Sequence, residues 1–277
     1  MIKVLLTRSS LKVIATLILF SGCEQFEYHA YETNRYNPPA EASNAYNLQL
    51  LNKIGQKDTL RLIFIGDTQR YYDDLKEAVQ AINNVDEVDA VIIAGDLVEF
   101  AFSKEYQWVA EELVKLKVPF LTVVGNHDCL ANGIDAYTKI YGPLNYAFTW
   151  NRIRFIMHNT NSREFSFDKS APDLDWMTQA LADENNYDYS LFVSHVPPYH
   201  DDFDEELEQE YIQIIRNTKN TLLAVNGHQH YYALNQPYQD GIWYLNTSSP
   251  ANRAYAYVTL YTKDDAEKKF DCTMVQF

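Results

Sequence analysis

Five short apolar runs in this chain each break off at a polar side chain of a type that binds metal ions. The residues at the breaks are Asp67, Asp96, Asn126, His195 and His228. One such break is ordinary, because glycine, asparagine and aspartate commonly form the turn after a strand. Turn chemistry does not explain the imidazoles, or three consecutive polar groups at Asn126-His127-Asp128. The pattern predicts strands that deliver metal ligands from their ends.

From Leu60 onward, the first half of the chain alternates strand and helix patterns. Apolar runs predict strands at 60–65, 90–94 and 120–124, and helical spacing predicts helices at 73–84 and 103–116, with Ser103 as an N-cap. Continuous apolar strands belong to sheets buried on both faces. Alternation with helices predicts parallel strands, whose carboxyl ends meet at the edge where ligands bind. We therefore expect the polar side chains to converge.

The second half is less regular, but it also predicts strands and helices. In chain order we expect helix 132–141, a hairpin of strands 146–150 and 153–158, helix 173–182, strand 190–194, helix 205–216, and strands 222–225, 242–246, 254–262 and 272–277. His228 and His230 are two residues apart, a spacing that points both side chains to one side of an extended segment. We expect one α/β domain.

The first 22 residues have the layout of a secretory signal. Three basic residues precede an apolar run at 13–20, which is too short to span a bilayer, and Ser21-Gly22 lead to Cys23. Small residues directly before a cysteine resemble the lipobox of bacterial lipoproteins; a plain signal peptide with an incidental cysteine is the alternative. The resemblance implies an envelope lipoprotein held at the membrane through lipidated Cys23. Glu24, in the second mature position, favours the outer membrane.

The charge of the mature chain disfavours one class of partner. Loss of residues 1–22 removes three basic and no acidic side chains, which leaves 20 Lys and Arg against 38 Asp and Glu, a formal net charge of −18. Neutralisation of phosphates supplies most non-specific affinity for nucleic acids, so a nucleic-acid-binding module is not expected. Beyond Cys23, only Cys129 and Cys272 remain, which suit either one disulfide or two small buried residues.

The polar residues form five short signatures whose order resembles one protein family. They are Asp67-Thr68-Gln69, Gly95-Asp96-Leu97-Val98-Glu99, Gly125-Asn126-His127-Asp128, Ser194-His195 and Gly227-His228-Gln229-His230. This series is similar to the signatures of the calcineurin-like metallophosphoesterases. The resemblance implies an α/β fold, a four-layer α/β/β/α sandwich of two mixed sheets flanked by helices. The chain then divides into a lipoprotein signal peptide at 1–22, a tether and N-terminal docking segment at 23–57, and a catalytic domain at 58–277.

By position, the resemblance implies a pair of divalent metal ions and their ligands. The ligands are Asp67, Gln69 and His230 for the first ion, Asn126, His195 and His228 for the second, and Asp96 as a bridge between both. Such a pair neutralises a phosphoryl group and activates water for in-line displacement. The mixture of nitrogen and oxygen donors suits Mn, Fe, Zn or Co. The resemblance also implies that His127 contacts the phosphate and protonates the leaving group, and that Asp128 orients His127.

Gln69 departs from the family pattern, which normally has a histidine at this place. A Gln carbonyl oxygen can still bind a metal ion, but it is a weaker donor than imidazole, so the first ion is expected to bind less tightly. Two hypotheses follow. The first is a secreted, lipid-anchored hydrolase that cleaves phosphate mono- or diesters with metal-bound hydroxide. The second is a catalytically weakened surface protein on the same fold that binds a glycan or a phosphorylated ligand.

Contacts to a small or extended phosphoester substrate are predicted from position alone. Arg70 and Tyr71 follow the first signature, His158 ends a predicted strand, Arg163 lies just beyond it, and His200 follows His195 in a loop. Each also has an ordinary structural interpretation, because loop arginines are mostly solvated and lone histidines are mostly packed or hydrogen-bonded. No feature of the sequence predicts an oligomeric state.

Overall fold

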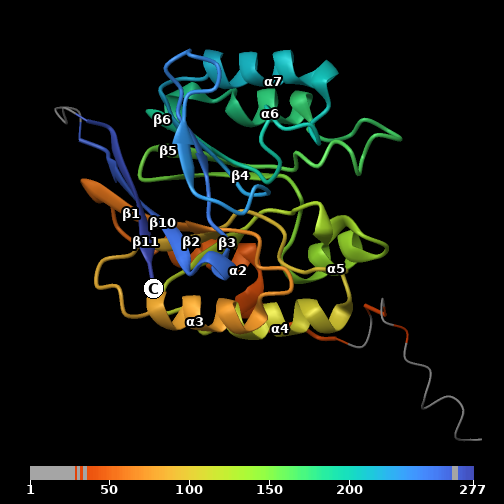
Figure 1. The fold of residues 1–277 in the computed structure, drawn as a ribbon. Helices are drawn as coiled ribbons and strands as arrows, with labels where there is room; N and C mark the ends of the chain where they lie inside the picture. The colour runs from red at the N-terminus through yellow and green to blue at the C-terminus, as the bar shows by residue number, and fades with distance from the viewer. Residues whose placement is uncertain (1–28, 30–31, 34–35, 264–267) are drawn as a thin grey trace, which may run out of the picture.

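The computed structural model describes residues 29, 32–33, 36–263 and 268–277. Two sheets pack face to face, and helices cover the outer face of each sheet (Figure 1). The predicted four-layer α/β/β/α sandwich of two mixed sheets is therefore confirmed. The predictions for residues 1–22 and for Cys23 lie outside the described residues. Within the described part of the chain, no helix combines the length and the apolar character needed to cross a membrane.

The first sheet has the strand order β11-β10-β1-β2-β3. Its strands are β1 (Thr59–Ile65), β2 (Ala90–Ile93), β3 (Phe120–Thr122), β10 (Ala254–Tyr261) and β11 (Phe270–Gln276). β1, β2 and β3 are parallel, as predicted, whereas β10 and β11 add antiparallel pairs at one side. The helices α3 (Tyr72–Ile82) and α4 (Ser103–Leu113) connect the parallel strands and cover the outer face (Figure 1).

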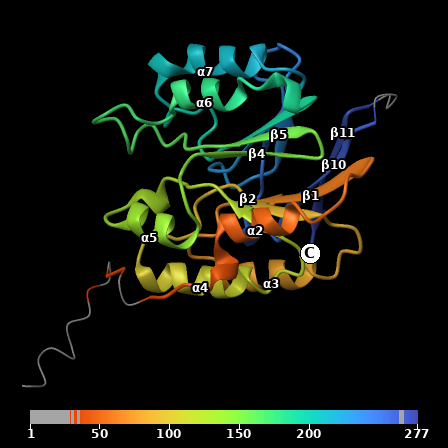
Figure 2. The same cartoon turned by 180° about the vertical axis from the view of Figure 1, so that it is seen from behind.

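The second sheet has the strand order β4-β5-β6-β7-β9-β8. Its strands are β4 (Tyr146–Trp150), β5 (Ile153–Met157), β6 (Tyr189–Val193), β7 (Thr221–Asn226), β8 (Ala233–Asn235) and β9 (Tyr244–Asn246). The four inner strands are parallel, and the edge strands β4 and β8 are antiparallel to their neighbours. The helices α6 (Leu174–Leu181) and α7 (Glu205–Asn217) cover its outer face (Figure 2).

Three hydrophobic cores separate the four layers, and side chains of β1 show how the layers form. Ile63 and Ile65 pack toward α3 and α4, whereas Leu62 and Phe64 pack into the core between the two sheets. The third core lies between the second sheet and the helices α6 and α7. Full burial of such a side chain contributes about 1.5–3 kcal/mol. The strand therefore alternates between two cores, which explains its almost continuous apolar sequence.

Shorter elements complete the fold. They are η2 (Ala40–Ala42), α2 (Asn44–Leu51), η3 (His127–Cys129), α5 (Gly133–Ile140), η4 (Glu184–Asn186) and η5 (Pro250–Asn252). α2 is held against the edge of β3 by asparagines, because Asn44 Oδ1 accepts from Thr122 N and Asn47 Oδ1 accepts from Phe120 N. This contact pairs backbone groups that an edge strand would otherwise leave open. Ser103 is the first residue of α4 and not its N-cap, so that prediction was wrong.

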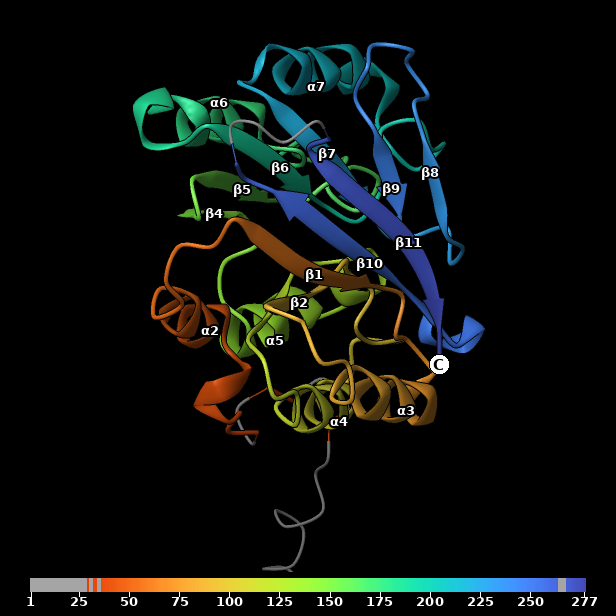
Figure 3. The same cartoon turned by 90° about the vertical axis from the view of Figure 1, so that its left-hand side faces the viewer.

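The carboxyl ends of five strands lie at one end of the two sheets. β1, β2 and β3 of the first sheet and β6 and β7 of the second all run toward this end, because the strands within each set are parallel. Figure 3 shows the two sheets stacked face to face. Each of the five apolar runs identified in the sequence leads into a loop at this end, so the loops of two different sheets can contribute to one site.

Candidate metal centre

Several predicted ligands have an unusual backbone conformation. Asp67 and Asp96 both have φ of 53°, and His228 and His230 have φ of 73° and 58°. Non-glycine residues seldom adopt positive φ, and backbone strain of this kind concentrates at functional sites. The chain therefore turns sharply where it leaves β1, β2 and β7, and the ligand side chains are placed by these turns.

Two glycines allow the loops to approach each other closely. Gly95 has φ of 86°, and a Cβ atom on it would lie 2.5 Å from Nδ1 of His195. A Cβ atom on Gly125 would collide with the backbone nitrogen of Asp96. Glycine is needed where one backbone segment comes this close to another group. Gly95 thus permits the loop after β2 to meet the loop after β6 of the other sheet, and Gly125 permits the loops after β2 and β3 of the first sheet to meet.

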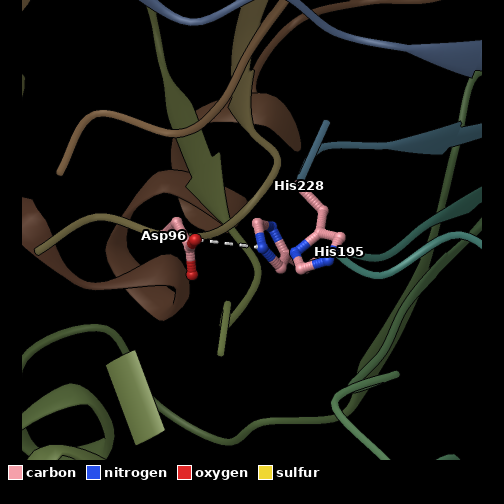
Figure 4. Close-up of side chains that lie close together, drawn as sticks. All are labelled: Asp96, His195 and His228. Carbon is pink, nitrogen blue, oxygen red and sulfur yellow. Dashed lines mark ion pairs between the residues drawn. The ribbon is translucent and has the colours of Figure 1, made fainter. Parts of the chain in front are cut away.

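One group of predicted ligands gathers around the Asn126 side chain. Asn126 Oδ1 lies 3.0 Å from Nε2 of His195 and 3.0 Å from Nδ1 of His228. Asp96 Oδ2 lies 3.2 Å from Nε2 of His195 (Figure 4). The other ring nitrogen of His195 lies 2.7 Å from the carbonyl oxygen of Ala94, which fixes the orientation of this fully buried ring. We call these four side chains the second group.

A first group lies on the other side of Asp96. Asp67 Oδ1 is 3.5 Å from Nε2 of His230. Gln69 Nε2 donates to Asp96 Oδ2 at 3.1 Å and lies 3.2 Å from Nε2 of His230. The first group therefore consists of Asp67, Gln69 and His230 and also borders Asp96. The structure brings all seven predicted ligands together.

Burial affects the two carboxylates of the site differently. Burial raises the pKa of Asp67 to about 8, and the neighbouring charge of Asp96 adds to this effect. Burial also opposes ionisation of Asp96, but the charge and hydrogen bond of His195 hold the pKa of Asp96 below its ordinary value. The pKa of His195 is raised in turn to about 9, because Asp96 outweighs the burial that would lower it. The charge of His195 also favours ionisation of Asp67, but burial outweighs it there.

The buried oxygens of the first group fit a bound cation. Asp67 Oδ2 and Gln69 Oε1 are buried and have no hydrogen-bond partner within the described part of the chain. Buried polar atoms normally have a partner, and a buried charge normally pairs with a counter-ion or a metal. Groups of carboxylate and imidazole atoms here lie within 4.8 Å of one another. The donors present thus suit a divalent ion with nitrogen and oxygen ligands.

His127 lies beside the ligands and is held in two ways. Its backbone N–H donates to Asp96 Oδ1 at 2.9 Å. Its ring Nδ1 lies 2.8 Å from the carbonyl oxygen of Glu99 and 3.8 Å from Oε2 of the same residue. Arg70 binds both carboxylate oxygens of Glu99. These contacts leave Nε2 of His127 as the ring nitrogen available to a substrate.

Asp128 was predicted to orient His127, but in the described part of the chain its carboxylate is not bonded to the His127 ring. Its carboxylate accepts from the backbone N–H groups of Gly125 at 2.8 Å, Leu97 at 3.1 Å and Val98 at 3.3 Å. These donors belong to the loops after β2 and β3, and Asp128 therefore ties the two loops together. The residue that supports the His127 ring is Glu99, which the sequence analysis did not assign.

The predicted substrate contacts differ in their surroundings. His158 was predicted wrongly: it is buried, its Nε2 lies 2.8 Å from the hydroxyl of Tyr211, and burial lowers its pKa to about 4. The ring of His200 packs edge-on against His228 with centroids 4.4 Å apart. Arg163 forms an ion pair with Asp202, which itself contacts His228. His200 and Arg163 remain predicted substrate contacts. Arg70, beside Glu99, and Tyr71, at the start of α3, also remain predicted substrate contacts.

Residues 60–232 match the calcineurin-like phosphoesterase family. The chain belongs to this family. The description of this family is that of a phosphoesterase. The match spans all five signatures, from before Asp67 to beyond His230.

Individual relatives agree with this assignment. A dimetal phosphatase from Danio rerio has a TM-score of 0.61 at 16% identity, over 78% of this calcineurin-like phosphoesterase and 97% of that chain. The anchor in the inner membrane complex of Plasmodium has a TM-score of 0.57 at 16% identity, over 79% and 85%. At such identities the similarity is one of fold. A probable cyclic nucleotide phosphodiesterase from Xenorhabdus bovienii (strain SS-2004) is 27% identical over 70 residues, which are 25% of this chain and 28% of that relative.

Proposed function

We propose that this phosphoesterase binds two divalent cations, one on each side of Asp96, and hydrolyses phosphate mono- or diesters with them. The position of Asp96 carries the proposal, since its carboxylate lies within 4.8 Å of ligand atoms of Asp67 and His230 in the first group, and of His195 and His228 in the second. A carboxylate offers two oxygens with several lone pairs, so it can serve two cations, whereas each neutral imidazole offers one free nitrogen. The shared carboxylate therefore favours two ions over one.

The residues indicate which cations are suitable. The donors are carboxylate and amide oxygens together with imidazole nitrogens, a mixture that favours Mn, Fe, Zn or Co. The unpartnered oxygens of Asp67 and Gln69 would complete the first group's ligand set. When bound, two such ions neutralise a phosphoryl group and activate water for in-line attack.

His127 is the proposed proton donor to the leaving oxygen. Its Nδ1 is fixed by the carbonyl oxygen of Glu99, so a proton on Nε2 points away from that support. The Glu99 carboxylate also lies beside this ring, with Oε2 3.8 Å from Nδ1. The side chains of His127 and His230 are 30% and 41% exposed, so a substrate phosphate can reach both. A positioned acid of this kind contributes about 10²–10⁴ in rate.

The decisive experiment combines metal analysis with activity. The full chain is stripped with a chelator and reloaded separately with Mn, Fe, Zn or Co. Elemental analysis then gives the number of ions per chain, and cleavage is compared for p-nitrophenyl phosphate and bis(p-nitrophenyl) phosphate. We expect two ions per chain and cleavage that the chelator abolishes. The ratio of the two rates assigns preference for a monoester or a diester.

We further propose that the enzyme is exported and anchored to the bacterial outer membrane through lipid on Cys23. The basic segment, the apolar run at 13–20 and the small residues before Cys23 support this. Mass spectrometry of the mature N-terminus from an expressing bacterium tests it. We expect diacylglycerol on Cys23 and release of the chain into the soluble fraction in a Cys23→Ser variant. An unmodified N-terminus would contradict the anchor without affecting the catalytic proposal.

A second function is favoured by one feature of the site. Gln69 stands where the family has a histidine, and a protein of similar fold is described as an anchor in Plasmodium. The second candidate is therefore a surface protein that uses the sandwich to bind a glycan or a phosphorylated ligand with little turnover. One ion or none per chain, and no cleavage with any of the four metals, would favour this candidate over two-cation hydrolysis.

A further inference from the structure

The two ring nitrogens of His228 face different oxygen atoms. Nδ1 lies 3.0 Å from Oδ1 of Asn126, on the side of the second group. Nε2 lies 3.1 Å from Oδ2 of Asp202, on the far side of the ring. A neutral imidazole carries one proton, so only one nitrogen is a donor and the other is a free acceptor. The choice between the two oxygens decides whether Nδ1 can bind a cation.

Asp202 is the stronger acceptor and is itself fixed in place. A carboxylate accepts a stronger hydrogen bond than an amide carbonyl does. Arg163 pairs with Oδ1 of Asp202, which leaves Oδ2 for His228. The backbone N–H of Asp202 donates to Nδ1 of His200 at 3.1 Å, and its backbone oxygen accepts from Ser162 Oγ at 3.3 Å. These contacts hold Asp202 in place, with Oδ2 of its carboxylate directed at Nε2 of His228.

We propose that Asp202 is a positioning residue for the metal ligand His228. By accepting the Nε2 proton, Asp202 leaves the lone pair of Nδ1 directed at the second cation position. This inference rests on the two-cation function proposed above. A carboxylate or carbonyl behind a metal-binding histidine fixes the ring and raises its basicity, and loss of such a partner costs about 10–100-fold in metal affinity.

The neighbouring histidine of the second group is arranged in the same way. His195 has one nitrogen toward Asn126 and Asp96 and the other 2.7 Å from the carbonyl oxygen of Ala94. In His195 the backbone accepts the far proton, whereas in His228 a side chain does. Of these two acceptors, only Asp202 is a side chain, so only Asp202 can be removed by a substitution.

An alternative use of the same residues is a separate cation site. Ligand atoms of His200, Asp202 and His228 lie within 4.8 Å of one another. The 3.1 Å separation of His228 Nε2 from Asp202 Oδ2 is that of a hydrogen bond. A cation between these atoms would require Nε2 to lose its proton, and it would compete with the orientation of Nδ1. The geometry favours the hydrogen bond, and metal analysis separates the two.

Three variants of the full chain test the proposal by calorimetric titration with Zn²⁺ and elemental analysis. In Asp202→Ala we expect one of the two binding steps to weaken by about 10–100-fold, with the other step changed less than twofold. Asp202→Asn keeps an acceptor oxygen and should lose less affinity than Asp202→Ala. Asp201→Ala, at the exposed neighbouring residue, is the matched control and should bind as the wild type does. Circular dichroism melting confirms that each variant is folded.

A spectroscopic measurement keeps the test decisive if a variant fails to fold. In the Zn²⁺-loaded wild type labelled with ¹⁵N-histidine, long-range proton–nitrogen spectra should show His228 protonated at Nε2, with the signal assigned by its loss in His228→Gln. A proton at Nδ1 would overturn the proposal. So would unchanged binding in Asp202→Ala, equal losses in Asp202→Ala and Asp202→Asn, or a third ion that Asp202→Ala removes. Fewer than two ions in the wild type would contradict the two-cation function, while the tautomer of His228 would still decide the role of Asp202.

Discussion

The two proposed cation positions on either side of Asp96 are built differently. At the first, Asp67 Oδ2 and Gln69 Oε1 are buried oxygens without a partner in the described part of the chain, and the His230 side chain is 41% exposed. At the second, His195 is fully buried with its far nitrogen on a carbonyl oxygen, and His228 is backed by Asp202. The second position is oriented before any cation arrives.

This difference predicts which position should hold its ion more tightly. Ligands that are already oriented lose less conformational freedom on binding, so preorganisation increases affinity. Each position includes one amide donor, but the imidazole of the first position is partly exposed, although the unpartnered oxygens of this position attract a cation. We therefore expect the second position to fill first and the first position to determine how much metal the active enzyme needs.

The largest effect is expected where the two positions meet. Asp96→Asn keeps the oxygen that accepts from the His127 N–H but removes the shared negative charge. We expect both ions to be lost and turnover to fall by at least about 10³, since the ions contribute several kcal/mol and each 1.36 kcal/mol is tenfold. Elemental analysis and phosphoesterase assays measure this, with Asp73→Asn at an exposed site as the control. Two retained ions would mean that Asp96 is not shared.

A pair of substitutions removes one position at a time. His230→Ala should leave one tightly bound ion, whereas His195→Ala should lose the tighter ion and retain only weak binding. Both should abolish most activity, because in-line displacement uses both cations. Zn²⁺ titration of each variant checks the order of affinities. Equal residual affinity in the two variants would show that burial and orientation of His195 do not distinguish the positions.

His127→Ala leaves both positions intact and removes the proposed acid. Because His127 is held by Glu99 and touches Asp96 only through its backbone N–H, we expect both ions to remain bound. Turnover should fall by about 10² or more, the scale for one acid–base group. The loss should be smaller for a substrate whose leaving group needs no proton. A variant with wild-type turnover would assign the proton transfer to another group.

The sequence predicts which side chains converge better than it predicts the residues that support them. Asp67, Asp96 and Asn126 follow recognisable strands, and parallel strands bring their ends together by a general rule. Glu99 supports the His127 ring, and Asp202 supports the predicted ligand His228, through contacts that depend on how separate loops fold, and nothing in their local sequence indicates this.

Two differences from the predictions have the same physical origin. Asp128 follows His127 directly, yet its carboxylate turns to the backbone amides of Leu97, Val98 and Gly125. His158 ends a strand as the ligands do, but its ring faces Tyr211 of α7, 53 residues away, and is buried. A strand end in the sequence predicts where the backbone of a residue lies, but it does not predict which groups the side chain contacts. The short strand β8 was missed because three residues show no periodic pattern.

The smallest predicted effect comes from restoring the family's residue at the first position. Gln69→His replaces an amide, whose Oε1 has no partner and whose Nε2 lies 3.2 Å from His230, with a stronger nitrogen donor. We expect the weaker of the two binding steps to tighten by about tenfold, or about 1.4 kcal/mol, with the stronger step unchanged. Zn²⁺ titration measures both steps, and Gln69→Ala, which should weaken the same step, is the opposing control. If Gln69→His tightened the stronger step, the assignment of the first position as the weaker one would be wrong. If it raised turnover from almost nothing to that of an efficient hydrolase, the natural protein would be the binding protein of the second hypothesis, with Gln69 as the cause of its lost activity.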